Sequence, residues 1–197
     1  MGDSTPDSAV HQLNGSFSIW EHRKITRGAN AKKRGSSYLA GIAKLTDFST
    51  VEQFWKFWDY IPTPSQLFAV NQNTYRRVES LSVFRQGIEP KWEDEKNSTG
   101  GEYYFRDRVE LDLLDKYWEE TVLGLIGETL DPDGTQLCGA RVVDKTGNRG
   151  PMFRLELWFT NDKDEAMKER IKQKFTSCLE TAISASGIPT IEHRAHA

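Results

Sequence analysis

Trp92 and Glu93 are adjacent residues whose side chains together could recognise a purine base. They lie in the run Gly87-Ile88-Glu89-Pro90-Lys91-Trp92-Glu93-Asp94-Glu95-Lys96-Asn97, which is too charged for a core strand and too aromatic for an ordinary solvated loop. Pro90 favours extended backbone before it, and the pair Gly100-Gly101 permits a tight reversal. The indole ring could stack on a base, while the carboxylate accepts two hydrogen bonds from the N1–H and N2–H₂ donors of guanine. Adenine lacks that pair of donors.

Local sequence alone leaves two other interpretations of this loop open. Trp92 could be a partly buried anchor that holds the loop to the core, and this is about as consistent with the pattern as a binding role. Asp94 and Glu95, next to Glu93, could belong to a metal site. However, adjacent side chains on extended backbone point to opposite faces, and no further ligands are evident elsewhere in the sequence.

Length and charge limit the class of protein. A chain of 197 residues favours one domain with a substantial core. Its net charge of −3 argues against a protein that grips long nucleic acid through the phosphate backbone, so we expect any bound nucleic acid to be short. Cys138 and Cys178 are too few and too far apart for a disulfide framework or a zinc site. With no signal peptide and no apolar run of about 18 residues, we expect a cytoplasmic protein, with nuclear import left open.

Hydrophobic periodicity predicts an α+β domain with an antiparallel sheet, because strands joined by short connections are interspersed with helices. Residues 1–15 are polar and predict a flexible segment, so the single domain is expected at residues 16–197. A basic loop at 21–37 separates the first two strands. Strands are predicted at 16–20, 38–45, 75–84, 103–105, 137–144 and 152–160, helices at 49–60, 112–128 and 164–186, and an additional edge strand at 188–191.

The helix at 49–60 has the clearest boundary signals. Ser49 and Glu52 have the spacing of a capping box at its beginning, and Pro62 and Pro64 are expected to end it. In the helix at 112–128, an apolar stripe should face the sheet, and Leu123 lies roughly opposite that stripe.

Several of these segments together resemble one protein family. The run from Trp92 to Asn97, preceded by Gly87-Ile88-Glu89-Pro90, is similar to the translation initiation factor 4E family, which binds the 7-methylguanosine 5′ cap of mRNA. The resemblance extends over roughly residues 11–197 and also includes Ser49-Thr50-Val51-Glu52-Gln53-Phe54-Trp55, Tyr117-Trp118-Glu119-Glu120-Thr121, Leu125-Ile126-Gly127-Glu128 and Cys138-Gly139-Ala140. It implies a curved antiparallel sheet with three helices packed on its convex face and a cap slot on its concave face.

The resemblance also assigns cap-binding residues. A positively charged 7-methylguanine would be held between two aromatic rings, so that stacking and cation–π attraction act together. Base-binding positions match Tyr38, Trp92, Glu93 and Trp158. The two phosphate-binding positions match Lys145 and Arg154 most closely, and Arg149 could replace either because the connection between the strands is longer here.

This chain departs from the family pattern at two of the matched positions. Tyr38 replaces the more usual Trp, and on its own it would be taken for an ordinary strand aromatic, as Trp158 would be taken for a core residue. Glu102 stands where the family has a cation, which is expected to weaken phosphate binding unless the basic loop at 23–34 compensates.

A second surface is implied on the convex face. His11, Val51, Trp55 and Leu123 match the positions at which the family binds a scaffold initiation factor, or a repressor, through a helical Tyr-x-x-x-x-Leu-apolar motif. Glu119 falls where the family often has Leu, so the choice of partner is expected to differ. We expect a monomer that binds no membrane, metal or cofactor.

The expected function is that of a non-catalytic adaptor in translation initiation, with capped mRNA on one face and a protein partner on the other. The alternative is a weakly binding homologue that acts as a translational repressor or as a protein-interaction module. An enzyme is disfavoured because the sequence has no phosphate-loop glycine motif, no Cys–His or Ser–His signature and no helical Glu cluster for metal-assisted hydrolysis.

Overall fold

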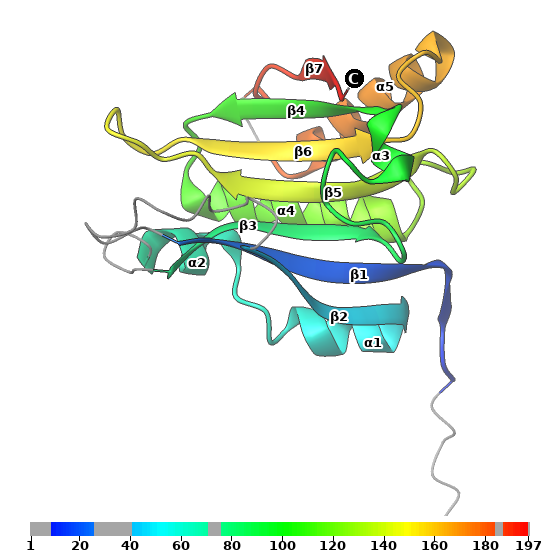
Figure 1. Cartoon of the computed structure of the whole chain (residues 1–197), viewed down its shortest axis with the longest axis horizontal. Coiled ribbons are helices and arrows are strands. Elements are labelled where there is room, and N and C mark those ends of the chain that lie inside the picture. The colour runs from blue at the N-terminus through cyan, green and yellow to red at the C-terminus, as the bar shows by residue number, and fades with distance from the viewer. Residues whose placement is uncertain (1–8, 26–40, 71–75, 184–186, 197) are drawn as a thin grey trace, which may run out of the picture.

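A single seven-stranded sheet organises the structure, a computed structural model that describes residues 9–25, 41–70, 76–183 and 187–196 (Figure 1). The strand order is β2-β1-β3-β5-β6-β4-β7, and every neighbouring pair is antiparallel. The strands are β1 (Gln12–Ile25), β2 (Ile42–Thr50), β3 (Arg76–Arg85), β4 (Gly101–Asp107), β5 (Leu137–Asp144), β6 (Phe153–Phe159) and β7 (Glu192–Ala195). The predicted α+β class is confirmed. Strand β1 begins inside the segment 1–15 that the sequence sets apart.

The helices of the described residues lie mainly behind this sheet in Figure 1, where α4 crosses behind β3 and β5. They are α1 (Val51–Trp58), α2 (Pro64–Val70), α3 (Glu95–Ser98), α4 (Leu111–Ile126) and α5 (Glu165–Thr181). The predicted apolar stripe of α4 is buried as expected, and it comprises Leu114, Trp118, Thr121, Val122 and Leu125. None of the described helices has both the length and the apolar character that a membrane span requires.

Two features at the ends of α1 differ from the sequence prediction. Helix α1 is capped by Thr50, whose side chain accepts a hydrogen bond from the Gln53 backbone N–H, and the Gln53 amide oxygen accepts one from Ser49 N–H. The capping box is therefore one residue later than the pair of Ser49 and Glu52 predicts. Pro64 does not simply end a helix, because it is the first residue of α2, where its missing N–H costs nothing.

The C-terminal part of the chain also differs from the expected boundaries. Helix α5 ends at Thr181, not at residue 186. The edge strand is β7, which follows the predicted range 188–191. Ile188 and Ile191 pack against the core instead of forming that strand, so their apolar character reflects burial of the connection.

Alternation along the central strands gives the sheet two different faces. On β5 and β6, Ala140, Val142, Leu155 and Leu157 belong to the large apolar core that includes the helices. The residues between them point the other way, since successive strand side chains alternate. These include Arg141, Arg154 and Glu156, which are buried although they are charged. The face opposite the helices is therefore both polar and enclosed, which is where a site can be built.

Candidate functional site

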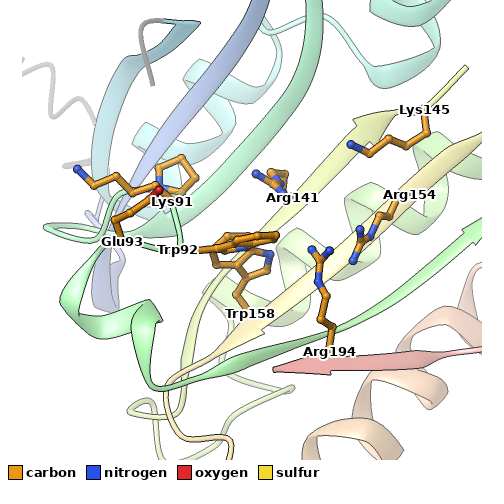
Figure 2. Close-up of a pocket in the computed structure, with 9 residues that line it drawn as sticks. Lys91, Trp92, Glu93, Arg141, Lys145, Arg154, Trp158 and Arg194 are labelled. Atoms are coloured by element: carbon orange, nitrogen blue, oxygen red, sulfur yellow. The ribbon is translucent and has the colours of Figure 1, made fainter. Parts of the chain in front are cut away.

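A cavity of about 320 Å³ lies on this polar face of the sheet (Figure 2). The loop between β3 and β4 forms one wall, and strands β5, β6 and β7 form the floor. Its lining consists of Pro90, Lys91, Trp92, Glu93, Arg141, Lys145, Arg154, Trp158 and Arg194. Five of the sequence-predicted site residues are thus brought together, namely Trp92, Glu93, Lys145, Arg154 and Trp158. Tyr38 lies outside the described residues.

The loop that carries Trp92 is held by buried hydrogen bonds. Asn97 is fully buried, and its side-chain amide donates to the carbonyl oxygens of Glu89 and Lys91, at 2.8 Å each. The Asp94 carboxylate accepts from the Glu89 backbone N–H at 3.0 Å and from Lys96 N–H at 3.0 Å, where it caps α3. These bonds hold the backbone of the loop while Trp92 and Glu93 remain exposed at its tip.

The same contacts bear on the metal interpretation of this loop. Asp94 already serves as the N-cap of α3. Over residues 9–25, 41–70, 76–183 and 187–196, no group of three or more His, Cys, Asp or Glu side chains is placed to hold a metal ion. The pair Gly100-Gly101, predicted to permit a reversal, also has a packing role. A Cβ at Gly100 would overlap the Phe159 carbonyl oxygen, so glycine is required for close packing of β4 on β6.

Trp158 is buried in the floor of the cavity, 0% exposed. Its indole N–H donates to Glu156 Oε2 at 2.9 Å, and its ring lies edge-on to Phe84 at 5.3 Å between centroids. The His196 ring lies 4.4 Å from the same indole. Trp158 is thus both a packed residue and a wall of the cavity, so the two interpretations of this position are compatible.

Alternating charges run across the floor from β5 to β7. Arg141 Nε donates to Glu156 Oε2 at 2.7 Å, and Arg154 Nε lies 3.2 Å from Glu156 Oε1. Arg154 and Arg194 both pair with Glu102 Oε1, the latter at 2.6 Å. Burial alone would raise the pKa of Glu156, but Arg141 and Arg154 hold it below the usual value. The Glu156 carboxylate is therefore ionised, and both it and Glu102 stand between arginines.

Lys145 and Arg149 were both predicted to bind phosphate, but the structure places them differently. Lys145 lines the cavity, and burial lowers the pKa of its ammonium. Arg149 is exposed and does not line the cavity, and its carbonyl oxygen accepts a hydrogen bond from Arg108.

On the far side of the sheet, three of the four predicted partner residues form one group. The Val51 backbone N–H donates to the His11 carbonyl at 2.9 Å, and the His11 ring contacts Glu52 at 2.7 Å. Trp55 follows one turn later on α1 and is 40% exposed. Leu123 lies on a different helix, α4, and is partly buried against the core.

Sequence reasoning missed Arg141, Glu156, Arg194 and His196. A signal existed for Glu156, because Arg154 and Glu156 are charged residues at alternate positions of β6, and such alternation predicts a polar face. Arg141 lies between apolar residues of β5 and is not part of such an alternation. Arg194 and His196 gave no such signal, since their place beside the cavity depends on the pairing of β7 with β4, in which Arg194 lies opposite Glu102.

Comparison with known proteins identifies the family. The family model described as Eukaryotic initiation factor 4E matches residues 12–196. The chain belongs to this family. Translation initiation factor 4E of Saccharomyces cerevisiae is 33% identical over 180 residues, which cover 91% of this chain and 75% of the relative. The corresponding factor of Eremothecium gossypii is 31% identical over 197 residues, which cover 100% and 82%.

Solved structures of other initiation factor 4E proteins have the same fold. Caenorhabditis elegans eIF4E-3, in complex with the 4E-binding protein Mextli and a cap analog, superposes with a TM-score of 0.73 at 25% identity, over 95% of this chain and 94% of that one. Ascaris suum eIF4E-3 in complex with an m7G cap gives 0.72 at 26% identity, over 96% and 93%. The family and the fold that the sequence implied are both confirmed.

Proposed function

We propose that this protein binds the 7-methylguanosine cap of mRNA and recruits a protein partner in translation initiation. The observation that carries the proposal is the cavity itself, which joins an exposed indole ring and a free carboxylate at one end to several cations at the other. A cap has the same polarity, with a flat cationic base joined to an anionic triphosphate. Family membership and the complexes of relatives with caps support this assignment.

The two ends of the cavity would bind different parts of the cap. The face of Trp92 would stack on the methylated base, worth about 1–3 kcal/mol, with Tyr38 proposed as the second ring. The Glu93 carboxylate would accept the two guanine donors. Lys145 and Arg154 would bind the phosphates through charge-assisted hydrogen bonds, and Trp158 would close the floor beneath the methyl group.

The convex face would supply the second activity. We infer that His11, Val51, Trp55 and Leu123 contact a helical Tyr-x-x-x-x-Leu-apolar peptide, with the half-exposed Trp55 ring as the main anchor. Structures of relatives with Mextli and with a 4E-BP support a partner site of this kind. The segment from β1 to β7 would act as one cap-binding domain of a cytoplasmic adaptor, without catalytic activity.

Tryptophan fluorescence tests the cap site directly. The protein is titrated with 7-methyl-GTP and with GTP, and we expect the methylated nucleotide to bind at least tenfold more tightly. Trp92→Leu and Glu93→Gln should each weaken 7-methyl-GTP binding by roughly tenfold or more, since a stacked base or a charge-assisted pair is worth about 1.5–3 kcal/mol. Glu95→Gln removes the same charge from an exposed residue of the same segment that does not line the cavity, and it should bind normally. Equal binding of GTP and 7-methyl-GTP would reject the proposal.

A peptide-binding assay tests the other face. Trp55→Ala should weaken binding of a peptide with the helical motif by about 30-fold, as expected for a hot-spot residue worth ~2 kcal/mol. The same variant should bind 7-methyl-GTP normally. Tyr60, which is 85% exposed near the end of α1, provides the matched aromatic control. Unchanged peptide affinity in Trp55→Ala would exclude this surface.

A further inference from the structure

Arg194 is a cavity residue that neither the periodicity nor the family resemblance assigns. It lies on the edge strand β7, opposite Glu102 of β4, and its Nη2 donates to Glu102 Oε1 at 2.6 Å. Its guanidinium carbon lies 4.5 Å from the centroid of the Trp92 ring. Figure 2 shows the side chain rising from β7 into the space between Trp158 and Arg154. Arg194 therefore connects the aromatic end of the cavity to its cationic end.

The charges around Arg194 are incompletely balanced within the cluster. Glu102 Oε1 is shared by the guanidinium groups of Arg154 and Arg194, and Glu156 is shared by Arg141 and Arg154. This cluster of five side chains therefore contains three cations, Arg141, Arg154 and Arg194, and only two carboxylates. The buried Nε of Arg194 has no hydrogen-bond partner among the described residues. An unpaired buried donor beside excess positive charge favours an anionic ligand group.

Glu102 has a different meaning in this setting from the one that its sequence position suggests. It is fully buried and paired with two arginines, so it does not present a free negative charge to the cavity. Its carboxylate instead holds Arg194 over the cavity, while 36% of the Arg194 side chain remains exposed. The family resemblance implies a cation at position 102. In this chain the cation is Arg194, which lies directly opposite that position on the neighbouring strand β7.

On the basis of the proposed function, we propose that Arg194 is a ligand-binding cation of the cap site that contacts the phosphate chain. Glu102 is its anchor, and the guanidinium lies over the ring of Trp92 at the wall of the cavity. This assignment makes a specific prediction, because a phosphate-binding cation contributes to affinity only when the ligand carries phosphates.

A phosphate series separates this role from others. Wild type, Arg194→Gln and Arg194→Lys are titrated with 7-methylguanosine, 7-methyl-GMP, 7-methyl-GDP and 7-methyl-GTP. In Arg194→Gln, we expect the gain in affinity from the nucleoside to the triphosphate to shrink about tenfold or more, while nucleoside affinity changes less than twofold. Arg194→Lys keeps the charge and should recover a large part of the gain. Arg170→Gln, an exposed site on α5 outside the cavity, is the matched control and should behave as wild type.

Three results would overturn the assignment. An equal loss for nucleoside and triphosphate would mean that Arg194 only supports Trp92. A gain in nucleoside affinity would mean that Arg194 competes with the base for the ring. Unchanged triphosphate affinity in a folded variant would remove Arg194 from the site.

Failure of the proposed function can be distinguished from failure of the Arg194 assignment, because plain GTP carries the same triphosphate. If wild type bound GTP and 7-methyl-GTP equally, methyl recognition would fail, yet the GTP affinities of the variants would still test Arg194.

Discussion

Substitution of Glu156 by Gln tests the charged floor on which the proposed site rests. Glu156 is 0% exposed, forms ion pairs with Arg141 and Arg154, and accepts a hydrogen bond from the indole N–H of Trp158. Glutamine has nearly the same shape and keeps an acceptor for the indole, but it removes the negative charge between two buried guanidinium groups. Loss of one partner from a buried ion pair costs about 3–5 kcal/mol. We therefore expect Glu156→Gln to lower the free energy of unfolding by that amount.

Urea and thermal denaturation at pH 7 provide the measurement. For a chain of this size, 1 kcal/mol corresponds to roughly 2–4 °C, so the midpoint should fall by roughly 6–20 °C. The pH dependence has a definite sign. Because the folded pKa of Glu156 lies below the ordinary 4.5, its stabilisation is complete above that value and is lost as the pH falls through the lower, folded pKa. The difference between wild type and Glu156→Gln should accordingly shrink in acid.

A double-mutant cycle makes the test specific. Arg141→Gln combined with Glu156→Gln removes both members of the closest pair, so the double variant should be less destabilised than the sum of the two single variants by about 1–3 kcal/mol. If Glu156→Gln cost less than about 1 kcal/mol at pH 7, or if the two costs were simply additive, the buried network would not be the charge-paired structure described above.

Other parts of the molecule give simpler expectations. Gly100→Ala should lower the free energy of unfolding by about 1–3 kcal/mol or more, because its Cβ would overlap a backbone carbonyl of β6, whereas Gly147→Ala, with open space around it, should be nearly neutral in the same denaturation assay. The hydrogen bond from His11 lowers the pKa of Glu52 to about 2, so NMR titration should find that carboxylate ionised well below 4.5, and His11→Ala should return it toward 4.5. The stabilisation that Glu52 gives through this hydrogen bond is complete above pH 4.5 and should be lost as the pH falls through about 2, the folded pKa of Glu52. Burial raises the pKa of Cys138 to about 12, and a thiol reagent at pH 8 should therefore modify it only after unfolding; rapid reaction in the native protein would contradict its placement.

The parts of the fold that sequence predicts well are those specified by long periodic patterns. The apolar stripe of α4 was predicted from its periodicity and is buried, and β5 and β6 were predicted as paired strands close to their observed bounds. Boundaries depend on single residues and were less predictable. Two hydroxyl residues stand side by side before α1, and only the structure shows that Thr50 is the cap. A proline such as Pro64 can follow the end of one helix or begin the next, because proline is tolerated in a first helical turn, and here it begins α2.

The site shows the same division between local and long-range information. Trp92 and Glu93 could be identified because the chemistry of recognition lies in neighbouring residues of one loop. The charged floor could not, because it is assembled from three strands whose registers decide which side chains meet. Glu102 is the clearest example. In the sequence it is a charge reversal that argues for weak phosphate binding, and with it for a homologue that has lost the cap function.

The register of β4 and β7 changes that inference. Arg194 stands opposite Glu102 and pairs with it, so a cation lies beside the reversed charge although neither residue matches the family pattern. What an anionic ligand encounters is the sum of the charges around the cavity, not the identity of one position. The cations that line the cavity outnumber the carboxylates at it: the cations are Lys91, Arg141, Lys145, Arg154 and Arg194, and the carboxylates are Glu93 and the buried Glu102 and Glu156. The strength of the proposed phosphate site therefore depends on Arg194. If the phosphate series showed no contribution from Arg194, the negative charge of Glu102 would again predict weak phosphate binding. The chain would then be better explained as a translational repressor or a protein-interaction module.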